Sequence, residues 1–493
     1  MPLIFLVLFL LVLPEASHAV QDNRQPTQRI ALSFANDDFI PTSQQIEIAD
    51  ELGIRLFEIS YPSTATRIQN PNARFLVDAG PRFMVPGLLD GDIGQLSNHL
   101  AGLIADFRRQ TEDRVVAVSL FRYPFETYNG FPSYASALID SIETISEGPF
   151  FYHSALPNAD VIPEGFNFLS KRVAPGTALP EISPMVHLVP SDDRYQTYQT
   201  LNQVLEELHA LNESVLVIPA RWFFSQLNER PDLRYLVEDY LDGQAVTLPL
   251  PEQPDPNPFM NWSVILLLVI WGSYALHLRY QPIYSQSMAR YFSNHSFFVN
   301  DVMENRLRNV LPGTILLIQH ALLTGLFVFA CVEVVVSSHG LQVLNYYFQP
   351  IMFSESILLS LFVSSVLVTL LLQLVSVLWI YIFNKKLTSF SQVLNLYSWP
   401  LHLNLIVVTF LVVFNRVGFD EIWTLILGAV FLLIWFFSFN IAAIDSSKFL
   451  DNGRTLFLLA TLGVHLVLII GIIVFVFYSP AILEPILFST ELP

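Results

Sequence analysis

The sequence predicts an α/β domain built as a (β/α)8 barrel, complete or degenerate, followed by an all-α membrane domain of six transmembrane helices. Two observations carry this prediction. Residues 261–493 contain six long apolar runs, and about 20 apolar residues are enough to cross the ~30 Å hydrocarbon core of a bilayer. Over residues 20–247, short apolar runs alternate with helical patterns, which is typical of a parallel sheet with crossover helices.

Residues 1–19 have the pattern of a secretory signal peptide. A short apolar run is followed by Ser17-His18-Ala19, which predicts cleavage after Ala19, although no Lys or Arg precedes the run. An uncleaved anchor helix is the alternative. The one cysteine, Cys331, lies inside an apolar run, so the exported part can form neither a disulfide nor a cysteine-based metal site. We predict no metal site and no cofactor.

The charge of the exported part is strongly acidic. Residues 20–260 contain 32 Asp and Glu against 16 Lys and Arg, whereas residues 261–493 contain 10 against 9. Nucleic acid is therefore excluded as a partner, because its phosphates require a basic surface. Acidity also keeps a domain soluble, which is the simpler explanation of the charge.

The distribution of positive residues predicts the membrane topology. The six predicted spans are residues 262–277, 313–336, 356–383, 397–414, 422–443 and 455–478. Eight of the nine Lys and Arg residues after residue 260 lie in the loops after the first, third and fifth spans. The positive-inside rule makes those loops cytoplasmic. The N-terminal domain and the C-terminus are then extracytoplasmic, in agreement with the signal peptide, and the lipid bilayer is a predicted partner.

Ionisable residues inside the predicted spans are candidates for a functional role, because charge is costly to place in lipid. They are His320, Glu333, His402 and His465. Glu333 lies near the outer end of its span, where it can reach water. For His465, a neutral ring bonded between helices is the simpler interpretation. We find no Gly/Pro break inside a span and no inverted repeat, so the sequence signs of a secondary transporter are missing.

Two connecting segments have distinctive compositions. Residues 280–311 are aromatic and basic, which predicts an amphipathic segment on the cytoplasmic interface. Residues 248–260 are proline-rich, which predicts an extended linker. With its six spans and the run Leu-Tyr-Ser-Trp-Pro at residues 396–400, the membrane domain faintly resembles Yip-type multi-pass domains.

Eight strands are predicted in the exported domain, residues 20–247. Their ranges are residues 30–35, 55–60, 82–86, 115–121, 150–154, 185–189, 214–219 and 245–248. Most are short and not alternating, as expected for strands buried on both faces. Eight strands with helices between them favour a barrel. An open doubly wound sheet is the main alternative, but no glycine-rich phosphate loop follows the first strand.

Polar residues follow the predicted strands at their carboxyl ends, where barrels carry their chemistry. They are Asp37, Asp38, Glu58, Tyr61, Arg122, Tyr123, Glu126, Tyr152, His153, Asp192, Arg221 and Trp222. Carboxylates, aromatic rings and arginines at one rim suit a sugar, since rings stack on aromatic faces and hydroxyls bind carboxylates. We therefore take Glu58, Glu126 and Asp192 as candidate catalytic residues and the others as candidate ligand-binding residues.

Several of these residues also have a structural interpretation. Asp37, Asp38 and Asp192 precede predicted helices and are suited to their first turns. Glu58 lies within an apolar strand, so its carboxylate needs a partner, for which Arg122 or Arg221 is available. His153 is not expected to bind a metal, because no second histidine sits at a matching strand end.

The exported domain resembles the glycoside-hydrolase type of (β/α)8 barrel. Residues 30–35, 51–60 and 115–126 carry the likeness, which extends over about residues 28–250 and concerns the layout. The resemblance implies catalytic glutamates at the ends of strands four and seven. Here Glu126 lies past strand four without the preceding Asn, and Arg221 follows the predicted strand seven. Arginine stays protonated and cannot replace a carboxyl, so binding without two-glutamate hydrolysis is expected.

The sequence therefore predicts a membrane-anchored, extracytoplasmic barrel that binds a carbohydrate or cell-envelope polymer. An enzymatic form of this hypothesis has the barrel process the polymer as well. Two other classes stay open: a non-enzymatic envelope sensor or scaffold, and a transporter subunit. Two carboxylates facing each other at the rim would favour the enzyme, at about 5 Å for retention and ~6.5–9.5 Å for inversion.

Overall fold

The structure is a computed structural model. It describes residues 29–35, 39–60, 68, 70–81, 83–84, 93–128, 130–146, 148–154, 162–175, 184–191, 193–210, 214–253, 262–349, 353–354 and 356–492. The chain forms two compact units, Met1–Met84 with Gly91–Pro254 and Val85–Asp90 with Asp255–Pro493, and each is described by itself. The predicted signal peptide and most of the proline-rich linker lie outside the described residues.

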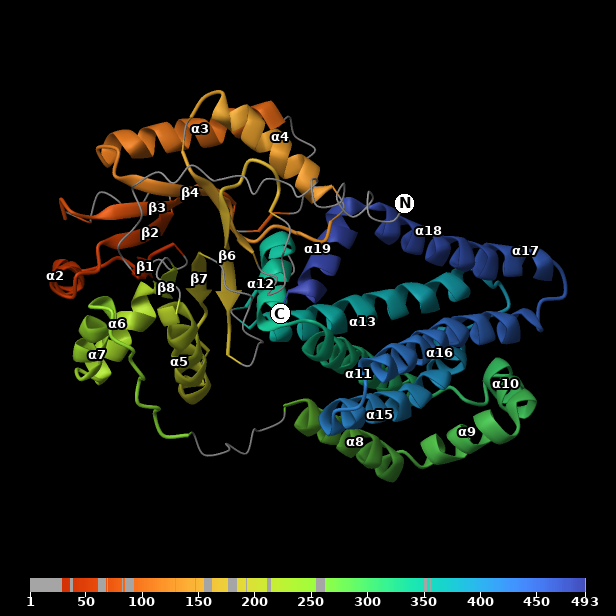
Figure 1. Ribbon diagram of the computed structural model, residues 1–493. Coiled ribbons are helices and arrows are strands. Elements are labelled where there is room, and N and C mark those ends of the chain that lie inside the picture. Colours follow the sequence, from red (N-terminus) through yellow and green to blue (C-terminus); the bar gives the residue numbers. More distant parts are fainter. Residues whose placement is uncertain are drawn as a thin grey trace, which may run out of the picture. The chain divides into compact units, whose positions relative to one another are not determined.

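The first unit is a closed barrel of eight parallel strands in sequential order, which confirms the predicted fold class. The strands are β1 Ile30–Ser33, β2 Leu56–Ser60, β3 Arg74–Asp78, β4 Val115–Phe121, β5 Phe150–Ser154, β6 Phe168–Val173, β7 Met185–Leu188 and β8 Val215–Pro219 (Figure 1). Pairing of β1 with β8, with Ile30 opposite Leu216, closes the barrel.

Two predicted strands were wrong and one strand was not predicted. The third strand is β3, eight residues before the predicted range 82–86, where Met84 forms only an isolated bridge to Pro124. The sixth strand, β6, was missed because its sequence FLSKRV carries three consecutive polar residues, Ser170, Lys171 and Arg172. Residues 245–248 form no strand, since the Asn202 side chain bonds the backbone N–H and C=O of Leu248. The predicted strands six and seven are therefore β7 and β8.

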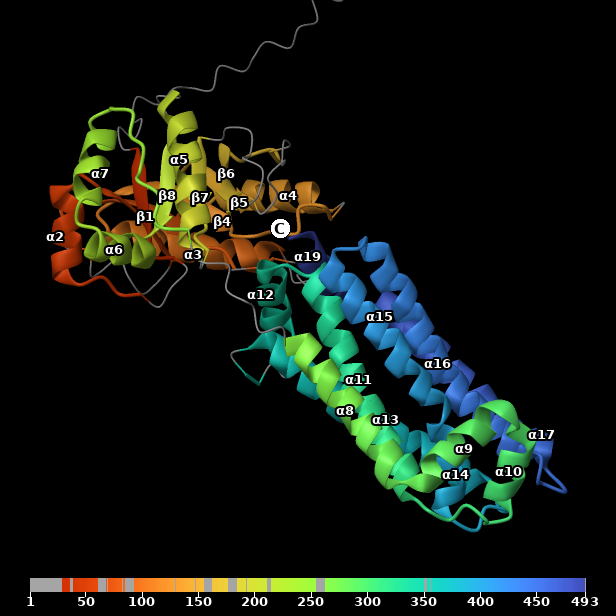
Figure 2. The same cartoon turned by 90° about the horizontal axis from the view of Figure 1, so that it is seen from below.

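Helices cover the barrel incompletely. They are α2 Ser43–Glu51, α3 Ile93–Gln110, α4 Phe131–Glu143, α5 Arg194–Ala210, α6 Ala220–Glu229 and α7 Leu233–Leu241 (Figure 2). Helix α2 starts at a capping box in which Thr42 and Gln45 satisfy each other's backbone N–H groups. Within the described residues, no helix separates β2 from β3, β5 from β6 or β6 from β7.

Inside the barrel, toward the amino ends of the strands, the side chains form a small apolar cluster. It consists of Ala31, Leu56, Leu76, Ala117, Phe151, Met185, Val215 and Val217, which come from seven strands. Side chains along a strand alternate between the two faces of the sheet, so these residues identify the positions that face inward. Phe151 stacks on Phe168 of β6 with ring centroids 5.0 Å apart, which extends the cluster to the eighth strand.

The second unit contains six helical segments that are long and apolar enough to cross a membrane. They are Trp262–Tyr280, Leu311–Val335, Ile357–Phe383, Phe390–Val417, Ile422–Ser447 and Arg454–Tyr478. These segments contain α8 Trp262–Tyr280, α11 Leu311–Val335, α13 Ile357–Phe383, α14 Phe390–Ser398, α15 Leu403–Val417, α16 Glu421–Ser447, α17 Arg454–Leu458 and α18 Val464–Tyr478. The six predicted spans correspond to these segments.

One span differs from the prediction. The fourth span was predicted to begin at residue 397, which would put Pro400 near its start, but α14 begins at Phe390. Pro400 therefore lies inside the segment, which passes through a short 3-10 turn at Pro400–His402 before α15 begins. A proline interrupts the α-helical hydrogen bonds, and the tighter turn accommodates it.

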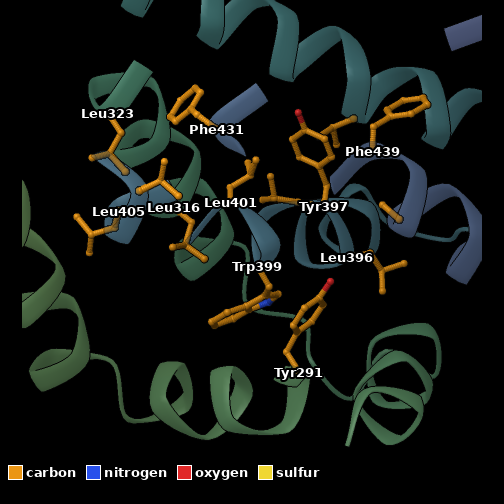
Figure 3. Packing of buried hydrophobic residues seen from close by; sticks show 14 of the residues in the cluster. Tyr291, Leu316, Leu323, Leu396, Tyr397, Trp399, Leu401, Leu405, Phe431 and Phe439 are labelled. Carbon is orange, nitrogen blue, oxygen red and sulfur yellow. The ribbon is translucent and has the colours of Figure 1, made fainter. Parts of the chain in front are cut away.

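Four shorter helices complete this unit: α9 Pro282–Ser293, α10 His295–Met303, α12 Ser338–Tyr347 and α19 Pro480–Glu491. The predicted amphipathic segment 280–311 forms α9 and α10. The unit's core is rich in large side chains, with Tyr397 and Trp399 buried between helices (Figure 3). Tyr397 accepts a hydrogen bond of 2.9 Å from Trp435 Nε1.

Candidate functional site at the carboxyl ends of the barrel strands

A layer of buried polar side chains lies directly above the apolar cluster inside the barrel. On seven of the eight strands, β8 being the exception, the residue two positions after an inward apolar residue, toward the carboxyl end of the strand, is polar. These are Ser33, Glu58, Asp78, Ser119, His153, Ser170 and His187, all at most 5 % exposed. The period of two along a strand places them on the inner face. Ser60, the next inward residue on β2, is only partly buried.

Glu58 on β2 is the centre of this layer. His187 Nε2 of β7 lies 3.2 Å from Glu58 Oε2 in a hydrogen bond, and Ser33 Oγ of β1 donates to the same oxygen. His153 Nε2 of β5 lies 2.9 Å from Glu58 Oε1, although this contact is not aligned as a hydrogen bond. Three strands thus bring donors to one buried carboxylate.

The surroundings fix the charge of this group. Burial by itself would raise the pKa of Glu58, but His153 and His187 outweigh burial and hold it well below its ordinary value. Burial lowers the pKa of His187, and the Glu58 charge opposes that shift only in part. Glu58 is therefore an ionised carboxylate, and His187 is neutral at pH 7.

An ion pair between Asp78 and Arg122 lies beside Glu58. Arg122 Nη1 is 2.9 Å from Asp78 Oδ2 and donates at 2.6 Å to the Ala35 carbonyl oxygen. Both side chains are at most 4 % exposed. The register between β4 and β5 shifts between Ser119 and Phe121. This shift explains how Arg122, which directly follows β4, reaches the interior.

Tyr123 adds an aromatic face to the layer. Its ring centroid lies 6.5 Å from that of His153 and 6.0 Å from that of Phe83. The Arg172 guanidinium of β6 stands 5.8 Å from the Tyr123 ring, within the range of a cation–π contact. The layer therefore combines carboxylates, imidazoles, arginines and one tyrosine.

Many polar atoms in this layer lack a hydrogen-bond partner among the described residues. They are Glu58 Oε1, Asp78 Oδ1, Arg122 Nε, Arg122 Nη2, His153 Nε2, His187 Nδ1 and Ser170 Oγ, all inaccessible to solvent. Buried polar groups are nearly always hydrogen-bonded, and unmatched ones require an explanation such as water or a ligand. Water or a bound polar molecule would satisfy atoms of this kind.

Two predicted site residues turn away from this layer. Tyr152 of β5 faces α4, where its ring centroid lies 5.8 Å from that of Phe131 and 5.1 Å from that of Phe166. The Glu126 side chain bonds the Tyr152 hydroxyl, and burial together with this carboxylate raises the pKa of Tyr152. The structure therefore does not bring Glu126 into contact with Glu58.

Arg221 and Trp222 follow β8 and belong to α6. Arg221 is exposed, and the Trp222 ring packs on Tyr198 of α5 at 5.9 Å. Trp222 lines an apolar pocket with Ile30, Leu216 and Ile218. These three residues alternate with the inward residues of β1 and β8, so the pocket lies outside the barrel wall. Neither residue joins the polar layer.

Four other predicted residues, Asp37, Asp38, Tyr61 and Asp192, lie outside the described residues. Asp193, the neighbour of Asp192, accepts a 3.1 Å hydrogen bond from the backbone N–H of Gln196 in the first turn of α5. Of the twelve predicted rim residues, Glu58, Arg122, Tyr123 and His153 thus belong to the polar layer or border it.

The sequence reasoning missed Ser33, Asp78, Arg172 and His187. Asp78 and Arg172 were missed because their strands were misplaced or unrecognised. Ser33 and His187 lie inside strands that were correctly located, but the prediction was based mainly on residues that follow the strand ends. A spacing of two along the strand would have identified both residues, because each follows an inward apolar residue by two positions.

The intramembrane candidates have partners in the second unit. His320 lies between Gln373 Nε2 at 2.7 Å and Asn404 Nδ2 at 2.9 Å, and it links α11, α13 and α15. Glu333 pairs with Arg416 at 2.8 Å. His465 Nδ1 is 3.4 Å from Asn440 Oδ1. Such polar contacts between helices are a common means of joining transmembrane segments.

Comparisons with known proteins are sparse. No family model matches the chain, so the resemblance to Yip-type domains has no support, and no curated protein matches it. Among solved structures, an endoglucanase of Pseudomonas stutzeri is similar with a TM-score of 0.31 and 12% sequence identity. The match covers 47% of this chain and 98% of that one. A likeness at this level carries no argument about function, and the barrel rests on its strand pairing.

Proposed function

We propose that this chain is a membrane-anchored protein whose barrel lies outside the cytoplasm and binds a carbohydrate or cell-envelope polymer at the carboxyl ends of its strands. The observation that supports this function is the buried polar layer around Glu58, with its seven unmatched polar atoms. The six apolar helical segments supply the anchor.

A polyhydroxylated ligand fits the chemistry of this layer. A sugar hydroxyl both donates and accepts hydrogen bonds, so it can satisfy the Asp78 carboxylate and the Arg122 guanidinium alike. Tyr123 offers an apolar ring for the face of a sugar. Ser60, above Glu58 and partly exposed, marks the side from which a ligand would reach the layer.

Hydrolysis by two glutamates is not part of this proposal. In the corrected strand numbering, β4 leads into Arg122 and β7 carries His187. Asp78 is engaged by Arg122, and Glu126 by Tyr152. A glycosidase needs one free carboxyl to protonate the leaving oxygen and a second carboxylate to attack or to activate water. The described carboxylates do not supply such a pair.

Binding tests this function directly. The full chain, purified in lipid nanodiscs, is screened against a panel of neutral and acidic glycans. The Glu58→Gln variant is expected to lose at least about tenfold in affinity, the effect of removing one charged hydrogen-bond acceptor. The control is Glu47→Gln, an exposed glutamate on α2. A panel without any binding glycan, or equal affinities for both variants and wild type, would refute the proposal.

The proposed topology has its own test. Cysteines introduced at Lys386 and at Glu238 in a Cys331→Ser background are treated with a membrane-impermeant thiol reagent on intact cells. We expect labelling at position 238 and none at position 386, because the positive residues mark the cytoplasmic side. The reverse pattern would show that the barrel is cytoplasmic.

A further inference from the structure

The tautomer of His187 is fixed by its surroundings. A carboxylate accepts hydrogen bonds but cannot donate one, so the 3.2 Å bond to Glu58 requires the proton on His187 Nε2. In the neutral ring, Nδ1 then carries the lone pair. Nδ1 is buried and has no partner among the described residues. His153 differs, because its Nε2 contact with Glu58 is not an aligned hydrogen bond.

A second edge of the Arg122 guanidinium lies in the same layer. Its Nη1 is occupied by Asp78 and by the Ala35 carbonyl, and the Tyr123 hydroxyl lies close to the guanidinium, whereas Nε and Nη2 make no aligned hydrogen bond within the described residues. Nε and Nη2 form the side of the guanidinium that binds a carboxylate through two parallel hydrogen bonds. The Arg122 charge is also close enough to lower the pKa of His187.

We propose that His187 transfers the proton in an elimination reaction on a carboxylate-bearing sugar polymer, with Arg122 binding the sugar carboxylate and Glu58 orienting His187. The proposal rests on the function proposed above and specifies it: the ligand is a polyuronate, and the reaction breaks the chain without water.

The elimination balances without any further reactant. His187 Nδ1 removes the proton from C5, the carbon next to the carboxylate, and the electron pair of the C5–H bond forms a C4–C5 double bond. The C4–O bond to the next sugar breaks, and the leaving oxygen takes the proton from the imidazolium of His187. Arg122 stabilises the negative charge that develops on the carboxylate during proton removal. The enzyme returns to its starting state.

Glu58 acts as a positioning residue in this reaction. It holds the proton on Nε2, which keeps Nδ1 available, and its charge stabilises the imidazolium that forms, as the aspartate does in a Ser-His-Asp triad. Hydrolysis would instead need a free second carboxyl, and Asp78 is bound to Arg122. The layer therefore suits proton abstraction better than attack by water.

The experiment uses the full chain in nanodiscs with polygalacturonate and polymannuronate as probes and a neutral β-glucan as control. Elimination creates a double bond conjugated with the carboxylate, which is followed by its ultraviolet absorbance. Reactions in ¹⁸O-labelled water and in D2O are analysed by mass spectrometry. We expect an unsaturated product from a polyuronate and no solvent oxygen in the new chain ends.

The variants separate the roles. His187→Gln is expected to lower the rate by about 100-fold or more, the usual contribution of a general base, while His153→Gln, which removes the other imidazole beside Glu58, loses less. Arg122→Lys is expected to raise KM, because lysine cannot form the two parallel bonds. Glu47→Gln serves as the unchanged control. Glu58→Gln is expected to move the acid limb of the rate to lower pH, because Glu58 raises the pKa of His187.

The outcomes distinguish this inference from the proposed function. Binding of a polyuronate without unsaturated product, or with solvent oxygen in the new chain ends, would overturn the elimination and leave the binding function intact. Absence of binding to all glycans would overturn both. An unchanged rate in His187→Gln, or an unshifted pH profile in Glu58→Gln, would overturn the roles given to these residues.

Discussion

Replacement of Asp78 by Asn tests whether the ion pair of Asp78 with Arg122 is as buried as the structure shows. Asp78 and Arg122 are 2.9 Å apart and at most 4 % exposed. At this distance and an effective dielectric constant of about 20, the attraction between the two charges is about 6 kcal/mol. Asn keeps the shape of Asp78 and removes its charge, so Arg122 is left with uncharged partners such as the Ala35 carbonyl.

The net cost is smaller than the lost attraction, because Asn needs less desolvation than a carboxylate. Removal of one partner from a buried ion pair costs about 3–5 kcal/mol. We expect this loss for Asp78→Asn. The double variant Asp78→Leu with Arg122→Met should recover much of it, because no uncompensated charge then remains buried.

The assay is urea unfolding of the full chain in nanodiscs, in which proteolysis of the unfolded barrel measures the unfolded fraction. The control is Glu229→Gln, which breaks an exposed ion pair: the Arg194 side chain is 53 % exposed and the Glu229 side chain 44 %. That change should cost less than about 1 kcal/mol. If Asp78→Asn costs no more than Glu229→Gln, water reaches the pair and the argument for a buried polar layer fails.

Three further predictions concern stability. Phe151→Ala, in the apolar cluster and fully buried, should cost about 3–5 kcal/mol in the same unfolding assay; a loss below about 1 kcal/mol would show a loosely packed interior. The pKa of Glu58 is held well below its ordinary value, so the ionised Glu58 stabilises the fold above its unfolded pKa of about 4.3, and this contribution is lost as pH falls through the lowered pKa. Glu58→Gln should therefore flatten the acid part of the curve of stability against pH. Parallel curves for the variant and the wild type would contradict this. Gly340→Ala should lower the melting temperature of the full chain, because an added Cβ would lie 1.9 Å from a backbone oxygen of α19. The control Gly428→Ala should be tolerated, because its added Cβ would lie 3.4 Å from the nearest atom. Equal melting temperatures of the two variants would argue against the close approach of α12 and α19.

The fold class was predictable because it depends on patterns that persist over many residues. Six apolar runs near the length of a bilayer crossing allow few alternatives. Strands buried on both faces also leave a readable apolar signal, as at 115–121 and 150–154. β6 escaped because its inward face is polar: Ser170 and Arg172 occupy positions that a sequence pattern treats as solvent-facing.

The site was predictable only in part, since convergence in space depends on the register of the strands. Glu58 attracted attention as a carboxylate within an apolar strand, and it is the centre of the layer. Its expected partner was an arginine, but the structure gives it two histidines. His187 comes from β7, 129 residues away. No local pattern reports such a contact, because it follows from closure of the whole barrel.

Closure of the barrel also sets the order of events during folding. The backbone N–H of Leu216 bonds the carbonyl of Arg29, so the first strand waits for a partner that lies almost 190 residues later in the chain. At a synthesis rate of about 5–20 residues per second, the wait lasts about 10–40 s. During that interval the free edge of β1 is a template for pairing with other chains. The first transmembrane helix, α8, begins only 43 residues after Pro219 ends β8. Closure of the barrel and synthesis of α8 therefore follow each other within seconds.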